Sequence, residues 1–230
     1  MKKITNIEST FKNKALFLQA LTHRSWVNEN DKKRGTNERL EFLGDAILEF
    51  IVSKKLYSKF PDKEEGYLTA LRANLVNTKN LYDVAEKIGL GEKIFLSKGE
   101  EDGGGRNNPS LLADTVEAII GALFIDSGLT KAEEFIKENI LVDLDKRAKA
   151  PLKDPKSLLQ EVIQAQKLPA PKYSVIDEIG PDHDKKFTVE VIIDDNRRAK
   201  GEGRSKSEAE QMAAKNALSS YCEIELDNIK

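Results

Sequence analysis

The spacing of apolar residues changes once along this chain of 230 residues, near residue 150. From residue 5 to about 145, apolar side chains recur every three or four positions, as in LYDVAEKIGL and AEEFIKENILVDL, which indicates amphipathic helices. The stretch KRAKAPLKDP that follows contains few large apolar groups and two prolines, a composition typical of a linker. We therefore expect a multidomain protein, with an all-α domain at 5–128, a helical extension to about 145 and a linker at 146–153.

Beyond this linker the sequence predicts a small α+β domain at 154–223. PKSLLQEVIQAQ is predicted to be a helix, with Asp154 as its N-cap and Pro155 at its first position. Three strand-like runs follow, KYSVIDEIG, FTVEVIID and RRAKGEGRS, and the turn residues between them favour an antiparallel meander. The run KSEAEQMAAKNALSSY predicts a closing helix. The order α-β-β-β-α predicts a sheet with both helices on one face.

Composition narrows the class of protein. The 39 acidic and 37 basic side chains nearly balance, so bulk charge indicates no partner of either sign, and any nucleic-acid surface must be local. The one cysteine excludes an intramolecular disulfide and fits a reducing compartment. No stretch approaches the roughly 18 to 20 apolar residues of a spanning helix, and the N-terminal apolar run is too short for a signal peptide. We expect a soluble, cytoplasmic protein with no membrane partner.

Acidic residues interrupt two predicted helices that are otherwise apolar. In NERLEFLGDAILEF, the acids Glu38, Glu41 and Asp45 fall within about 60° of one another on a helix and share one stripe. In SLLADTVEAIIGALFID, Asp114 and Glu117 also share a face, because they are three positions apart. If the two apolar faces pack together, at least four carboxylates come close, where repulsion and lost hydration are costly unless a cation binds.

The ligand types restrict the cation and the chemistry. Carboxylate oxygens suit Mg²⁺ or Mn²⁺, whereas zinc prefers Cys and His. Neither histidine lies three residues after a Glu, which excludes the Glu-x-x-His pattern of di-iron carboxylate proteins, and the acids do not form an EF-hand loop. Carboxylates that gather two or more Mg²⁺ ions serve in-line displacement at phosphorus, since the metals activate water and stabilise the leaving oxygen. Phosphodiester hydrolysis is the leading hypothesis.

A plainer alternative is that each acid lies on the solvated face of an amphipathic helix, as we expect for Glu49. Clustering on two strongly apolar helices favours the metal site for Glu41, Asp45, Asp114 and Glu117 taken together.

Several motifs resemble one known family. NERLEFLGDAIL resembles the signature of the ribonuclease III family, and LTHRSW, FPDKEEGYLTALRANLV, GEEDGGG and LLADTVEAIIGALFIDSG resemble its other segments in the same order. The C-terminal segment resembles the double-stranded RNA-binding domain of the bacterial members, so the likeness covers essentially the whole chain. It implies a homodimeric, Mg²⁺-dependent endoribonuclease, in which Mn²⁺ can substitute. Such an enzyme cuts double-stranded RNA to 5′-phosphate and 3′-hydroxyl ends with two-nucleotide 3′ overhangs, in processing of ribosomal RNA precursors, some messages and structured RNAs.

The resemblance also implies roles for the matching acids. Glu41, Asp114 and Glu117 would be metal ligands, and Asp45 and Glu117 would be the essential catalytic pair. A carboxylate that holds a metal-bound water is both a ligand and a route for its proton, so that the two roles overlap.

Three further residues match the family pattern. Glu38 and Glu65 match acids that line the cleft, with lesser or substrate-positioning roles. Phe42 would lie at the two-fold interface of the dimer, with the intrachain core as its alternative.

The C-terminal domain offers groups that fit an RNA duplex, whose readers touch 2′-hydroxyls in the minor groove and phosphates. Gln160 and Glu161 on the first helix have the size needed for minor-groove hydrogen bonds. The loop GPDHDKKF matches a loop of the family that would place His183 near a second minor groove, with a solvated loop residue as the alternative.

The last helix begins with a basic segment. Arg204, Ser205 and Lys206 would meet phosphates, with help from the helix N-terminus. The family often has a second basic residue after the first, but here it is Ser207, so we expect modest phosphate affinity. The alternative for the run NRRAKGEGRSK is a solvated strand and turn.

Other hypotheses explain less of the sequence. The GGG of EEDGGGR lacks the Gly-Lys-Ser/Thr of a nucleotide-binding loop, so we expect no nucleotide cofactor. His23 and Trp26 are expected to pack and to cap a helix.

A double-stranded RNA-binding regulator with little or no cleavage is the main alternative function, but every acid of the motif is present. A structural helical dimer with an acidic face leaves the second domain unexplained.

Overall fold

The computed structural model divides the chain into two compact units, between Leu152 and Lys153. It describes residues 7–30, 34–150, 152, 154–181, 185–194 and 198–227, without the side chains of 221–227. The helices of the first unit are α2 (Lys14–Ala20), α3 (Arg24–Glu29), α4 (Glu38–Lys59), α5 (Glu65–Val76), α6 (Thr78–Ile88), α7 (Lys98–Asp102), the 3-10 helix η2 (Gly105–Asn107), α8 (Pro109–Ser127), α9 (Leu129–Asn139) and α10 (Leu144–Lys149). The second unit contains α11 (Pro155–Ala165), β1 (Lys172–Ile179), β2 (Lys186–Ile192), β3 (Arg198–Gly203) and α12 (Lys206–Asp227).

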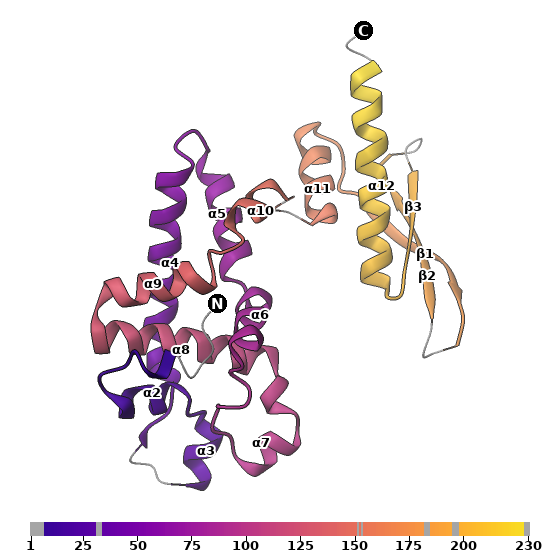
Figure 1. Cartoon of the computed structure of the whole chain (residues 1–230). Coiled ribbons are helices and arrows are strands. Elements are labelled where there is room, and N and C mark those ends of the chain that lie inside the picture. The colour runs from indigo at the N-terminus through magenta and orange to yellow at the C-terminus, as the bar shows by residue number, and fades with distance from the viewer. Residues whose placement is uncertain are drawn as a thin grey trace. The chain divides into compact units, whose positions relative to one another are not determined.

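Helix α8 lies at the centre of the first unit, where it contacts α2, α4, α6 and α9 (Figure 1). A helix that is apolar on all sides must be covered on all sides. Accordingly, the side chains from Leu112 to Leu123 are buried except for those of Asp114 and Glu117, which are half-buried. Both exceptions are acids of the predicted site.

The backbones of α4 and α8 touch at two glycines. A Cβ atom on Gly44 would lie 1.8 Å from the carbonyl oxygen of Glu117, and one on Gly121 would lie 2.1 Å from that of Leu40. No side chain fits at either position, because both neighbours are backbone atoms held in helices. The two glycines therefore set how closely α4 and α8 approach.

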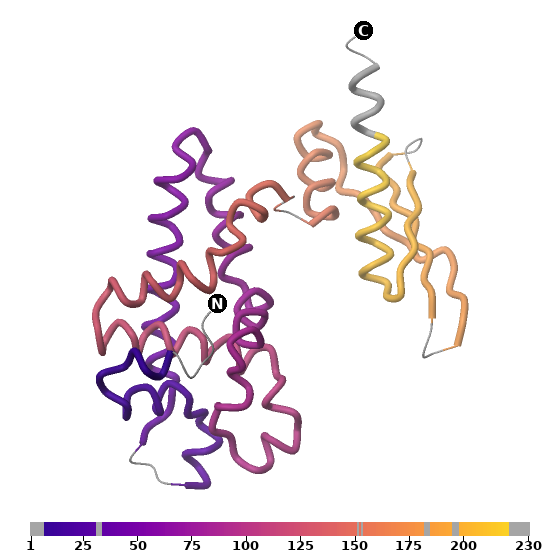
Figure 2. The backbone as a smooth tube through the Cα atoms, viewed as in Figure 1, coloured from indigo at the N-terminus to yellow at the C-terminus, as the bar shows by residue number. Residues whose placement is uncertain are grey.

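Helices α4 and α5 form an antiparallel helical hairpin. The chain turns through 60–64 and continues as α5, as the tube in Figure 2 shows. Helices α4 and α5 pack against each other along this hairpin. The start of α5 therefore lies beside the end of α4, far from the start of α4.

The second unit is a three-stranded antiparallel sheet in the order β1-β2-β3, with α11 and α12 covering one face (Figure 1). Its core gathers Leu159 and Ile163 from α11, Val189 and Val191 from β2, and alanines of α12. The expected α-β-β-β-α fold after an all-α unit is confirmed. Asp154 caps α11 as expected, since its side chain accepts hydrogen bonds from two backbone amides of the first turn.

Helix α10 extends the first unit into the segment that the sequence predicts as a linker. The carbonyl of Ala148 accepts a 3.0 Å hydrogen bond from the hydroxyl of Tyr67, and the Arg147 guanidinium donates to the Asn74 side chain at 3.0 Å. Arg147 and Ala148, within the predicted linker, therefore pack on α5. Among the helices of the described ranges, none has the length and apolar character needed to cross a membrane.

The glycine contact predicts a stability effect. Gly121→Ala should lower the free energy of unfolding by about 1–3 kcal/mol, because the new methyl group must push α4 and α8 apart. Gly66→Ala on α5 is the matched control, since its added Cβ has no neighbour within 4 Å. Urea unfolding followed by circular dichroism measures both. Equal stability of the two variants would contradict this account of the α4–α8 contact.

Candidate active site

The acids of the site lie on the two helices that touch at the glycines. Glu41 and Asp45 flank Gly44 on α4, and Gly44 meets the backbone of Glu117 on α8. Asp114 lies one turn before Glu117 on the same face. Packing of α4 on α8 therefore brings these carboxylates together from segments about seventy residues apart in sequence.

Three of the acids form one compact group. Carboxylate oxygens of Glu41, Asp114 and Glu117 all lie within 4.8 Å of one another, and each side chain is partly buried. The structure thus brings together the three residues that the sequence predicts as metal ligands. Asp45 lies one turn beyond Glu41, is exposed, and stands outside this group of three.

Burial and mutual repulsion perturb these carboxyls. Burial, followed by the charges of Asp45, Asp114 and Glu41, raises the pKa of Glu117 to about 8. Burial, followed by the charges of neighbouring acids, also raises the pKa of Glu41. Burial raises the pKa of Asp114, and the charge interaction with His23 lowers it by a smaller amount. The metal-free site therefore disfavours its own negative charge.

The donor set fits a hard divalent cation. Three convergent carboxylates offer only oxygen ligands, and a positive charge among them would stabilise the ionised form that burial and neighbouring charges disfavour at Glu117. Among the described residues, no histidine or cysteine lies within this group of acids, so the group lacks the ligands that zinc and copper prefer.

Three of the predicted site acids, Glu38, Glu41 and Asp114, line a polar cleft of about 780 Å³. Its lining combines carboxylates with hydrogen-bond donors, and comprises His23, Arg24, Ser25, Asn28, Asn37, Glu38, Glu41, Glu100, Asn108, Ser110, Leu111 and Asp114. A cleft with both kinds of group can hold metal ions on one wall and phosphate oxygens on the other. Sequence reasoning missed most of the donors, although LTHRSW contains three of them.

The segment that supplies these donors is fixed by short backbone contacts. The amide of His23 donates to the carbonyl of Phe95 at 3.1 Å, and the amide of Asn37 donates to the carbonyl of Thr22 at 2.9 Å. His23 caps α3, as expected, because its ring nitrogen accepts from the amide of Ser25. Burial is the main cause that lowers the pKa of His23, which favours the neutral form of the ring.

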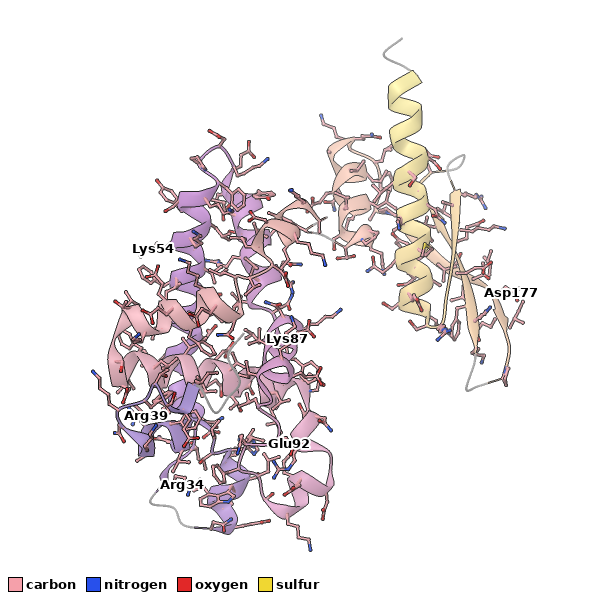
Figure 3. The ribbon with its side chains drawn as sticks, viewed as in Figure 1. Arg34, Arg39, Lys54, Lys87, Glu92 and Asp177 are labelled. Atoms are coloured by element: carbon pink, nitrogen blue, oxygen red, sulfur yellow. The ribbon has the colours of Figure 1, made fainter. Side chains whose placement is uncertain are left out.

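Trp26 also packs as expected. Its ring lies 5.8 Å from the ring of Phe95, and the guanidinium of Arg34, labelled in Figure 3, lies within 4.5 Å of both ring centroids. These contacts hold α3 against the segment that contains Phe95.

The remaining predicted acids lie in different places. Glu38 lines the cleft, where its carboxylate lies 3.6 Å from the Arg24 guanidinium and accepts a 3.0 Å hydrogen bond from the Thr36 hydroxyl. Glu65 begins α5 and accepts a hydrogen bond from the Thr69 hydroxyl. It lies near the far end of α4, and that end is about 27 Å along the helix axis from Glu41 at about 1.5 Å per residue. Within one chain Glu65 is therefore remote from the other acids.

Phe42 projects away from the core of its own chain. Its side chain is 81% exposed, and Phe50 and Tyr57, farther along the same side of α4, are 55% and 77% exposed. The intrachain alternative for Phe42 is therefore wrong, because α4 turns its other face toward α8. Glu49 is exposed, as expected.

The predicted RNA-contact residues of the second unit are exposed. Gln160 and Glu161 lie on α11, and Arg204, Ser205 and Lys206 lie where α12 begins. His183 lies outside the described residues.

The start of α12 is a reciprocal cap. The Ser205 hydroxyl accepts from the amide of Glu208, and the Glu208 carboxylate accepts from the amide of Arg204 at 2.7 Å. Glu208, which follows Ser207, therefore holds the first turn of the helix in place. The exposed donors of this turn lie on a rigid element.

Comparisons with known proteins follow the same two units. Residues 13–144 match the family described as Ribonuclease-III-like, and residues 155–221 match the double-stranded RNA binding motif. The chain is 43% identical to Ribonuclease 3 of Borreliella burgdorferi over 228 residues, which cover 98% of this chain and 92% of that protein. It is 45% identical to Ribonuclease 3 of Oceanobacillus iheyensis over 212 residues, which cover 92% and 93% of the two chains.

Solved structures resemble the first unit. A crystal structure of the nuclease domain of ribonuclease III from Campylobacter jejuni matches with a TM-score of 0.55 and 43% identity, covering 61% of this chain and 95% of that one. A second structure of that domain, with a TM-score of 0.55 and 42% identity over 60% of this chain and 96% of that one, shows flexibility in its region involved in dimer formation.

The fold, the acidic cleft and these matches define an endoribonuclease with an appended domain for double-stranded RNA. The chain belongs to the ribonuclease III family. This confirms the prediction of an endoribonuclease.

The raised pKa of Glu117 predicts a pH-dependent stability. The pKa of its carboxyl is raised to about 8 in the folded metal-free protein and returns to its ordinary value of 4.5 when the chain unfolds, so the folded state holds the extra proton between these values. Stability should therefore fall as pH rises from about 5 to 8. Thermal unfolding in EDTA, across this range, measures the effect.

Glu117→Gln is the control, since an amide does not titrate, and its melting temperature should vary less with pH than that of the wild type. Mg²⁺ added at pH 8 should raise the melting temperature of the wild type more than that of the variant. Identical pH dependence of the two proteins would refute the titration assigned to Glu117.

Proposed function

We propose that this chain cleaves double-stranded RNA with Mg²⁺, or with Mn²⁺ in its place, and leaves 5′-phosphate and 3′-hydroxyl ends with two-nucleotide 3′ overhangs. The observation that carries this proposal is the convergence of Glu41, Asp114 and Glu117, whose carboxylate oxygens lie within 4.8 Å of one another, beside a polar cleft that Glu41 and Asp114 line. Membership of the ribonuclease III family and the RNA-binding motif support the substrate class.

Each acid has a proposed task. Glu41, Asp114 and Glu117 hold the cation, which when bound activates water and stabilises charge at phosphorus. Asp45 and Glu117 form the catalytic pair, in which the exposed Asp45 carboxylate accepts a proton, while the half-buried Glu117 carboxylate both holds the cation and provides a route for a proton. Glu38 positions the substrate together with Arg24, its partner at 3.6 Å.

The active form is proposed to be a homodimer. The exposed aromatic stripe of Phe42, Phe50 and Tyr57 on α4 supports this, because solvated aromatic surface of this kind is typical of protein interfaces. Glu65 gives a second reason, since its remote position within one chain means that any role in a cleft requires the partner's copy.

The second unit is proposed to hold the duplex. Gln160 and Glu161 contact the minor groove, and Arg204, Ser205 and Lys206 contact phosphates at the start of α12. His183 remains a predicted contact at a second minor groove. We place the protein in the cytoplasm, where it acts on ribosomal RNA precursors, some messages and structured RNAs. Family membership supports this assignment.

Cleavage of a long RNA duplex by the purified protein in Mg²⁺ tests the active site. Glu117→Gln should lower the cleavage rate by about 10²–10⁴-fold, because it removes both a metal ligand and a proton-handling group. Duplex binding in EDTA should stay nearly unchanged, since it rests on the second unit. Mapping both strand ends of the products measures the end chemistry and the overhang.

Glu49→Gln is the matched control, because Glu49 lies exposed on α4 and faces Arg72 at 4.0 Å. This variant should cleave at the wild-type rate. A Glu117→Gln protein that cleaves as fast as the wild type would refute the role proposed for Glu117. Preferential cutting of single-stranded RNA would refute double-stranded RNA as the substrate.

The aromatic stripe predicts the oligomeric state. Phe42→Glu should shift the protein to a monomer and reduce cleavage, because it places a charge within the proposed interface, at its most exposed aromatic residue. Sedimentation velocity measures the change. Val142→Glu, at a 58% exposed apolar residue outside α4, should leave the dimer intact. A dimer that survives Phe42→Glu would remove this face from the interface.

A further inference from the structure

Strand β1 carries one extra residue, which reverses the faces of the residues after it. Val175 pairs with Val189, but Asp177 pairs with Thr188 and Glu178 with Phe187, so the register shifts between Val175 and Asp177. In an uninterrupted strand Glu178 would lie on the open face of the sheet. The bulge instead turns it to the side covered by the helices.

The neighbouring residue confirms this reversal. Asp177, labelled in Figure 3, extends from the sheet on the side away from α12. Phe187, the partner of Glu178, packs against the helix-covered core. Successive side chains of a strand point to opposite faces, so Glu178 lies on the same side as Phe187.

On this side Glu178 meets the start of α12. Its carboxylate lies 3.2 Å from the ammonium of Lys206 and 3.5 Å from that of Lys185. The Lys206 ammonium also lies 5.6 Å from the ring centroid of Phe187. The hydrogen bond from Lys206, followed by the charges of both lysines, lowers the pKa of Glu178, so the carboxylate is ionised at neutral pH.

We propose that Glu178 is a determinant of duplex affinity, because its carboxylate competes with RNA phosphate for the ammonium of Lys206. This inference rests on the proposed function, in which Lys206 contacts phosphate. An ammonium has three hydrogen-bond donors and one positive charge. The Glu178 carboxylate, 3.2 Å from the Lys206 ammonium, therefore takes up a donor and offsets the charge that a phosphate would otherwise contact. The carboxylate also repels an approaching polyanion.

The competition has a measurable signature. Removing the charge of Glu178 raises the local positive charge by one, which corresponds to about one more phosphate neutralised and a salt slope steeper by about 0.9. At about 0.15 M salt this corresponds to binding about fivefold tighter, and the gain disappears as the salt concentration approaches about 1 M. A purely structural role of Glu178 would change thermal stability and not the salt slope.

The test measures duplex binding by the full chain in EDTA, over a series of salt concentrations, by fluorescence anisotropy. Glu178→Gln should bind about fivefold tighter near about 0.15 M salt. Glu190→Gln is the matched control, because Glu190 is also a strand residue paired with a basic side chain, Arg198 at 3.4 Å, but lies on the open face. It should bind as the wild type does. An equal gain in affinity for both variants would show that the change in net charge alone strengthens binding, and it would overturn the proposal.

Lys206→Ala and the double variant with Glu178→Gln separate this inference from the proposed function. If Lys206→Ala weakens binding and the gain from Glu178→Gln is absent in the double variant, Glu178 acts through Lys206. If Lys206→Ala weakens binding but Glu178→Gln does not strengthen it, the competition is refuted and the phosphate contact stands. If Lys206→Ala binds as the wild type does, Lys206 makes no phosphate contact, and both ideas fail.

Discussion

The backbone contact between α4 and α8 is the constraint on which the nuclease unit depends. Gly44 and Gly121 let each helix touch a carbonyl of the other, at Glu117 and at Leu40. Because Gly44 lies between two acids of α4 and meets the residue that carries a third on α8, the same contact fixes the helix packing and the carboxylate geometry. The core and the candidate active site are thus set by one arrangement, and a shift of one helix would disturb both.

That arrangement has an electrostatic cost, which indicates what the site binds. Burial and neighbouring charges raise the pKa of Glu117 to about 8, and those of Glu41 and Asp114 also rise. A core helix that only stabilised its fold would gain nothing from such groups, since buried carboxylates without a cation are destabilising. A divalent cation bound among these acids would offset this cost, and the stability of the unit would then depend on the same groups as its chemistry.

The second unit uses related devices for recognition. Gly201 and Gly203 let β3 approach α12 so closely that a Cβ on either would lie within 2.5 Å of its backbone. The reciprocal cap of Ser205 and Glu208 holds the first turn of α12, and the bulge in β1 places Glu178 beside Lys206. Two acids therefore act at the start of α12. Glu208 fixes the first turn, which carries the basic side chains, and Glu178 is proposed to reduce the positive charge available to RNA phosphate.

The sequence by itself determined the features that depend on local spacing. The change of apolar period predicted a helical unit followed by α-β-β-β-α, and the i, i+3 spacing on two apolar helices predicted which carboxylates share a face. Only the tertiary structure decided which of them meet, because Asp45 lies on the stripe of Glu41 yet stays exposed, and Glu65 lies at the far end of α4. It also decided that Phe42 faces outward and that Glu178 pairs with Lys206. Helical periodicity is set within a few residues, whereas helix crossing, strand bulges and partner choice arise from packing between distant segments, which no local pattern encodes.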